Sequence, residues 1–120
     1  MNTPTIPRTD LLEQLIKLER PVEDVLSQLR AYPWDSDPLV QLTVDAVVSV
    51  LRRYMLGEIE AQAVAAWADA IEGRDDIGLV SKHRQSLKEV IWELANPEAN
   101  GPITRDRAST LYSQLSKLSS

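Results

Sequence analysis

Side chains that could carry out chemistry are scarce in this sequence. His83 is the only histidine, and the chain contains no cysteine, which excludes disulfides, thiol nucleophiles and zinc sites built on thiolates. It also contains no nucleophile elbow, Walker loop, HExxH motif or GxGxxG motif. We expect His83 to be a partly exposed residue at a helix end. The sequence therefore predicts a protein that is not an enzyme and that binds neither a metal ion nor a cofactor.

Acidic side chains, in contrast, are concentrated in two places. Four fall within eight residues, at the end of a predicted helix and in the turn after it, and two more are four residues apart on the outer face of a later helix. These candidate contacts for a basic partner, with the tryptophan beside the second group as an anchor, are Asp69, Glu72, Asp75, Asp76, Glu89, Trp92 and Glu93. In the alternative interpretation, Trp92 packs at the edge of the core and the acids only solvate the surface.

Composition narrows the possible partners. The chain has 120 residues, enough for one domain with a single core. Its formal net charge of −5 argues against binding to nucleic acids or to an anionic membrane surface, since both require clustered Lys and Arg. No stretch has the apolar length of a signal peptide or a membrane span. We therefore expect a cytoplasmic protein with neither a nucleic-acid nor a membrane partner.

The helix expected to organise the fold covers residues 38–56. Apolar residues occupy more than half of its circumference, so other helices must pack against it from several sides. Asp37 and Pro38 mark its start, as a capping side chain followed by a proline in the first turn, and Gly57 marks its end. The next helix carries Trp67 within its apolar arc, and we expect this side chain to lie in the core.

The N-terminal third predicts two shorter helices. Residues 1–8 contain two prolines and no periodicity, which predicts a loose tail. A first helix is expected from Asp10, and a second begins at Pro21, because proline breaks the first helix and is favoured at the start of the next. Trp34, in the turn-rich link that follows, is interpreted as a lid over the end of the helical bundle.

The C-terminal part predicts two more helices. Residues 74–78 have the composition of a turn, and a helix is expected over residues 81–95. Residues 96–102 predict a loop, after which Thr104 caps the last helix. The sequence thus predicts one all-α domain over residues 1–120, a bundle of five to six helices around the central one.

Two runs of the sequence carry a resemblance to known proteins: LRRYMLGEIEAQAVAAWADAIEGRDDIGL and LKEVIWELANPEANGPIT. In the first, residues 56–59 (LGEI) end a leucine-rich helix, and a helix with the inward Trp67 follows, before the acidic turn at residues 75–76. In the second, a helix ends in ELANP at residues 93–97. This pattern, over residues 32–115, resembles small helical bacterial immunity proteins, a group that includes colicin-D-immunity-like proteins and immunity proteins of contact-dependent growth inhibition systems.

The resemblance implies an immunity protein. Such a protein binds the C-terminal domain of a cognate toxin, here implied to be a nuclease, and covers its active site with an acidic helical surface. The negative charge agrees with this function, because a nuclease presents a basic cleft and charge complementarity speeds association. Glu60 departs from the family pattern, since Ser or Thr usually caps that helix. The alternative is a small helical scaffold or regulatory protein without a toxin partner, and self-association stays open.

Overall fold

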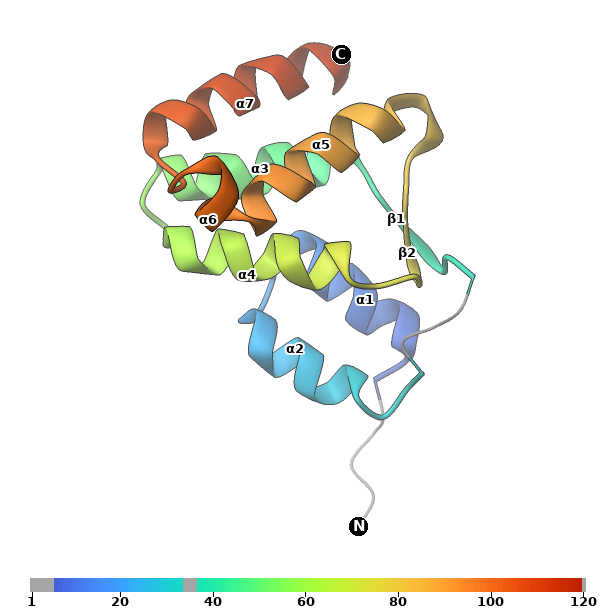
Figure 1. Cartoon of the computed structure of the whole chain (residues 1–120). Helices are drawn as coiled ribbons and strands as arrows, with labels where there is room; N and C mark the ends of the chain where they lie inside the picture. Colours follow the sequence, from blue (N-terminus) through green and yellow to red (C-terminus); the bar gives the residue numbers. More distant parts are fainter. Residues whose placement is uncertain (1–5, 34–36, 120) are drawn as a thin grey trace.

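Helices make up most of the computed structural model, which describes residues 6–33 and 37–119 (Figure 1). The helices are α1 (Arg8–Lys17), α2 (Val22–Leu29), α3 (Val44–Met55), α4 (Ala61–Glu72), α5 (Arg84–Ala95), α6 (Pro97–Asn100) and α7 (Arg105–Ser119). A 3₁₀ turn, η1 (Ser81–His83), leads into α5, and the two strands are β1 (Val40–Leu42) and β2 (Ile77–Leu79). The prediction of a mostly helical chain is confirmed, whereas the two strands contradict the prediction that it is helical throughout.

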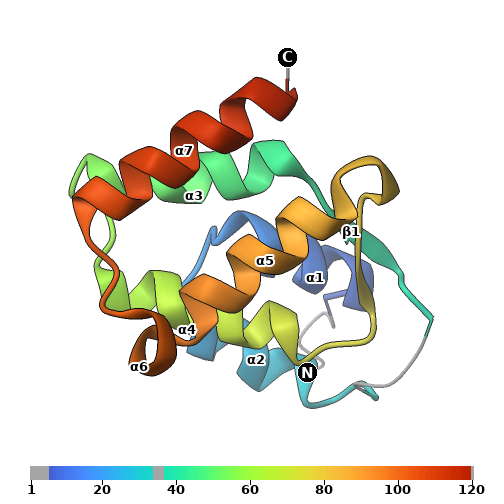
Figure 2. The same cartoon turned by 45° about the horizontal axis from the view of Figure 1, so that its top comes forward.

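Two pairs of helices dominate the packing. Helix α7 lies along α3, and α5 packs on α4, as both cartoon views show (Figures 1 and 2). The α1–α2 hairpin also packs against α4, and the strands close the end of the molecule where α4 ends and α5 begins. The predicted central position of α3 is only partly right, because α4 contacts α1, α2, α3 and α5.

Trp67 anchors the core of the molecule. It is fully buried, and its indole Nε1 donates a 3.0 Å hydrogen bond to the carbonyl oxygen of Ile16 in α1, so its polar atom is satisfied as well. The prediction that Trp67 is a core residue is confirmed. The long helices contribute buried apolar stripes around it, among them Leu11, Leu15, Val25, Leu29, Val47, Leu51, Val64, Leu87, Leu94, Leu111 and Leu115.

The helix predicted for residues 38–56 begins later than expected, at Val44. Its cap is Thr43, whose side-chain Oγ1 accepts a 3.2 Å hydrogen bond from the Ala46 N–H. At the other end, Gly57 adopts a φ of +80°, the left-handed conformation predicted for the residue that follows this helix. The physical reason for the late start is that the preceding segment pairs with β2 instead of continuing the helix.

Strands β1 and β2 pair in parallel. The register joins Val40 to Ile77, Gln41 to Gly78 and Leu42 to Leu79. Two consecutive backbone N–H groups, those of Leu39 and Val40, donate to the Asp76 carbonyl oxygen at 2.8 and 3.4 Å. The segment after Gly73 is therefore a turn only as far as Asp76, and the prediction of a turn through residue 78 is wrong. Pairing between segments separated by α3 and α4 leaves no periodic signal in three-residue strands.

The predicted N-terminal tail is shorter than residues 1–8. Helix α1 already begins at Arg8, and the Ile6 side chain packs against the core. The Tyr32 hydroxyl also donates a 2.7 Å hydrogen bond to the Ile6 carbonyl oxygen. The rest of the predicted tail, and Trp34 with its predicted role as a lid, lie outside the described residues.

The C-terminal part contains one unexpected helix. The short helix α6 occupies most of the segment predicted as a loop, because Pro97 favours the first turn of a helix. The predicted cap of α7 is confirmed, since the Thr104 Oγ1 accepts a 3.1 Å hydrogen bond from the Arg107 N–H. In the described part of the chain, no helix is long and apolar enough to cross a membrane.

Candidate binding groove

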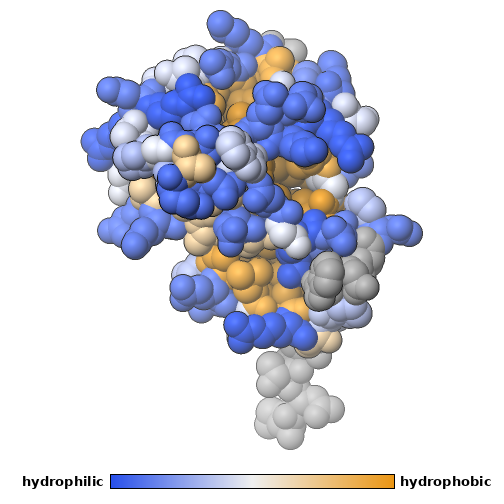
Figure 3. Space-filling model, viewed as in Figure 1, coloured by the Kyte–Doolittle hydropathy of each residue, from blue (hydrophilic) through white to orange (hydrophobic). Residues whose placement is uncertain are grey.

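A groove of about 490 Å³ opens between the end of α4, strand β2 and helix α5, and we call it the α4–α5 groove. Ile71, Leu79 and Ile91 give it an apolar wall, and charged side chains surround that wall. In the space-filling view, apolar surface shows between hydrophilic side chains at the level of the two strands (Figure 3). The volume lies within the usual range of binding pockets, roughly 300–1,000 Å³. Four of the seven predicted contacts line this groove: Glu72, Asp75, Glu89 and Trp92.

Trp92 is the aromatic side chain that the groove leaves open to solvent, with 49% of its surface exposed. Leu87, Ile91 and Leu94 occupy the buried face of α5, and the helical repeat turns Trp92 away from that face. Tryptophan is enriched among the side chains that dominate binding energy at interfaces. Its exposure beside an apolar wall makes Trp92 the best candidate for an anchor in this groove.

The acids of the groove rim come from three positions in the chain. Glu72 is the last residue of α4, Asp75 lies in the turn before β2, and Glu89 is on α5. All three are exposed, and none forms a salt bridge with a described residue. Glu89 accepts a 3.0 Å hydrogen bond from the Gln85 side-chain amide. These carboxylates are therefore free to pair with a cationic group from outside.

Three of the predicted contacts lie outside the groove: Asp69, Glu93 and the buried Asp76. Asp69 is exposed on α4 but does not line it. Glu93 accepts two 2.6 Å hydrogen bonds from the Arg107 guanidinium, a pair that ties α5 to α7 and raises the pKa of Arg107. Glu93 is already engaged within the protein, so it differs from Glu89 although both face outward on the same helix.

Asp76 is fully buried, and the prediction that it lies on the solvated surface is wrong. Its carboxylate accepts hydrogen bonds from Arg8 at 2.9 and 3.1 Å and from Arg74 at 2.9 Å through two nitrogens. Burial raises the pKa of the Asp76 carboxyl, but the hydrogen bonds and charges of Arg74 and Arg8 outweigh burial, and the pKa ends below its ordinary value. This buried triad joins α1 to the turn before β2, and so it holds one wall of the groove in place.

Sequence reasoning missed the cations of the groove. Arg84 and Lys88 line it from α5, and Arg74 lines it from the turn after α4. Arg74 is neutralised by Asp76, whereas neither Arg84 nor Lys88 forms a salt bridge with a described residue. The groove therefore carries charges of both signs, beyond the acidic side chains that the sequence led us to expect. The signal in the sequence was the four-residue spacing of Arg84 and Lys88, which places both on one helix face.

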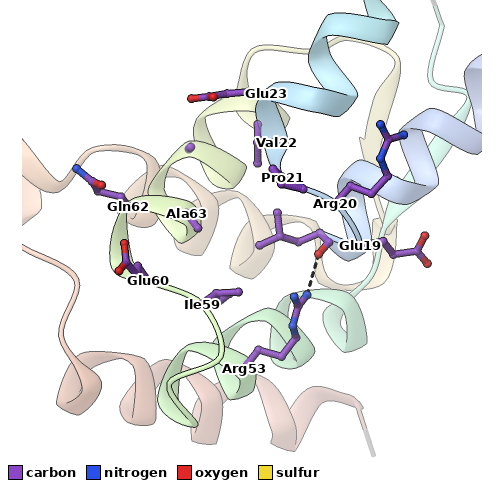
Figure 4. Close-up of a pocket in the computed structure, with 12 residues that line it drawn as sticks. Glu19, Arg20, Pro21, Val22, Glu23, Arg53, Ile59, Glu60, Gln62 and Ala63 are labelled. Carbon is purple, nitrogen blue, oxygen red and sulfur yellow. Dashed lines mark hydrogen bonds between the residues drawn. The ribbon is translucent and has the colours of Figure 1, made fainter.

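A second hollow, of about 460 Å³, lies between the α1–α2 connection and the start of α4 (Figure 4). Val22, Ile59 and Ala63 are apolar residues of its lining, and Glu60 stands at its margin. Arg53 donates a 2.9 Å hydrogen bond to a carbonyl oxygen at the end of α1, which fixes one side of the hollow. The hollow contains none of the predicted contacts, so the α4–α5 groove is the better candidate.

His83 lies in η1, partly exposed and outside the lining of the groove. Across residues 6–33 and 37–119, no group of three or more His, Cys, Asp or Glu side chains is arranged to hold a metal ion. An apolar wall, charges of both signs and an exposed tryptophan are features of surfaces that bind polypeptides. No protein-family model matches the chain, and neither does any curated protein or solved structure.

Proposed function

We propose that the protein is an immunity protein, which binds the C-terminal domain of a cognate toxin in the cytoplasm and neutralises it. The observation that carries the proposal is the half-exposed Trp92 beside an apolar wall whose rim holds Glu72, Asp75 and Glu89. The resemblance of the sequence to small helical immunity proteins supports the same function and implies a nuclease as the toxin.

The charges of the groove define the chemistry of the partner. A basic domain is attracted by the net charge of −5, and its Lys or Arg side chains can pair with Glu72 and Asp75 at close range. The face of Trp92 can also hold a cationic side chain. Arg84 and Lys88 repel a surface that is basic throughout, so they restrict the orientation of the partner and contribute to specificity.

The proposal is tested by copurification and by protection of cells. The C-terminal domain encoded by the adjacent upstream gene should bind the protein stoichiometrically, and co-expression should rescue cells from its toxicity. Trp92→Ala should weaken binding by about 2 kcal/mol or more, as is typical of an aromatic anchor. Joint reversal of Glu72 and Asp75 to Lys should weaken it by at least about tenfold, a loss of roughly 1.4 kcal/mol.

The matched control reverses two exposed acids away from the groove. Glu58→Lys with Glu60→Lys introduces the same change of charge in the link between α3 and α4, where Glu60 makes no capping hydrogen bond. This variant should bind and protect almost as well as the parent. An upstream product that does not bind, or full protection by both groove variants, would remove the basis of the proposal and favour a scaffold protein.

A further inference from the structure

We propose that the outer edge of β2 takes up an extended segment of the toxin domain as a third strand. This inference rests on the proposed function and specifies how the partner is recognised. The sheet formed by the described residues has only two strands, so β2 has one edge without a strand beside it. All three residues of β2, Ile77, Gly78 and Leu79, line the α4–α5 groove.

The pairing with β1 shows in which direction the backbone N–H of Ile77 points. The Asp76 carbonyl oxygen points toward β1, because it accepts hydrogen bonds from the N–H groups of Leu39 and Val40. The peptide bonds of the described residues are trans, and the C=O and N–H of a trans unit point in opposite directions. The N–H of Ile77 shares a peptide unit with that carbonyl and therefore points away from β1.

The same reasoning applies at the other end of the strand. The Val80 N–H donates a 3.1 Å hydrogen bond to the Leu42 carbonyl oxygen in β1, so the carbonyl of Leu79 points outward. Successive residues of a strand alternate in direction, so the N–H and C=O groups of both Ile77 and Leu79 face away from β1. No backbone hydrogen bond joins these groups to another described residue outside the sheet.

This edge fits an extended chain better than it fits a helix. Ile77 and Leu79 each present one donor and one acceptor, two residues apart, and an added strand satisfies both at this spacing. A helix has already used its own backbone groups internally. The occupant is therefore an extended stretch of the toxin domain, because strand addition lets the main chain supply affinity while the groove side chains supply specificity.

The surrounding charges specify the side chains of that stretch. Glu72 and Asp75 precede β2 in the chain and line the groove, so a Lys or Arg of the incoming strand meets them at this end. Trp92 can cover the aliphatic stem of the same residue. Arg84 follows β2 and η1, so an acidic or neutral residue is favoured near the other end.

Amide hydrogen exchange measured by NMR tests the inference without any substitution. In the free protein, the amide of the partly exposed Leu79 should exchange faster than that of Val80, which is bonded to β1. In the complex with the toxin domain, exchange at Leu79 and Ile77 should slow by at least about tenfold, and that of Val80 should change little. The Val80 amide thus serves as a control within the same strand.

Three other outcomes overturn the inference, and they can be told apart. If the complex forms and perturbs Trp92 but leaves the Leu79 and Ile77 amides unprotected, the inference fails and the proposed function stands. If these amides are already slow in the free protein and slow further at higher concentration, a second copy of the chain occupies the edge. If no complex forms with the toxin domain, the proposed function and the inference fail together.

A pair of substitutions isolates the outward donor of Leu79. Leu79→Pro removes the side chain and the N–H, and proline is tolerated in an edge strand where its nitrogen faces away from the neighbouring strand. Leu79→Ala removes only the side chain. We expect the proline variant to bind the toxin domain about tenfold more weakly than the alanine variant, because an acceptor of the added strand loses its donor. Equal affinity of two folded variants would contradict strand addition at this edge.

Discussion

Asp76 shows how much a single buried charge contributes to the stability of the fold. Its partners Arg8 and Arg74 have side chains only 16% and 11% exposed, so removing the carboxylate leaves two cations without compensation. We expect Asp76→Asn to lower the free energy of unfolding by about 3–5 kcal/mol, a large share of a total of about 5–15 kcal/mol. Urea unfolding measures this loss. Glu89→Gln, at an exposed carboxylate, is the matched control and should change stability by less than about 0.5 kcal/mol.

Acid titrates the same carboxylate. Because the pKa of Asp76 is lowered in the folded state, the unfolded chain binds the proton more readily, and stability must rise with pH in that range. The contribution of Asp76 is complete above its unfolded pKa, about 3.9, and is lost as the pH falls through the folded pKa. Unfolding of Asp76→Asn between about pH 2 and pH 6 should therefore show a shallower slope than that of the parent. Identical slopes would mean that another group governs acid unfolding.

Neighbouring residues differ in how far their positions could be predicted. Trp67 could be placed in the core because its own helix repeats apolar residues around it. Asp75 and Asp76 are chemically identical, yet the first is exposed and the second is buried. Asp76 pairs with Arg74, two residues away, and with Arg8, 68 residues away, and no local pattern records the distant partner.

The start of α3 provides a prediction at the scale of an element. Thr43→Ala removes the side-chain acceptor that caps the Ala46 N–H, and it should cost about 1 kcal/mol, measured by thermal or urea unfolding. Ser49→Ala, at an exposed position within α3, is the control and should be close to neutral. If Thr43→Ala were equally neutral, the stability of the helix would not depend on this cap.

Helices and strands differed in their predictability for a physical reason. A helix closes its hydrogen bonds within four residues, so α4, α5 and α7 leave an apolar repeat that the sequence displays. Strand β1 is defined by hydrogen bonds to β2, on the far side of two helices. The groove depends on that pairing. Four of its rim residues could be predicted, but the apolar wall and the cations that complete it could not.

The net charge of the whole molecule affects how fast it associates with a partner. If the protein binds a basic toxin domain, its net charge of −5 should steer the two together, and association should slow by about tenfold or more between low and high salt. Dissociation should change less, because screening acts over about 10 Å at 0.1 M and has little effect on pairs shielded in an interface. Stopped-flow or biosensor kinetics separate the two rates. An association rate that does not depend on salt concentration would show that electrostatic steering plays no part.

The contact between Arg8 and Asp76 also determines when the groove can form in a newly synthesised chain. In synthesis Arg8 precedes Asp76, and it stays without this partner until the whole of α4 has followed it. The α1–α2 hairpin rests on contacts close in sequence, whereas the sheet and the triad must close long loops, which costs entropy before any contact compensates for it. We therefore expect an early helical hairpin and a late groove. A nascent chain that stops before β2 would be partly folded and would lack the groove.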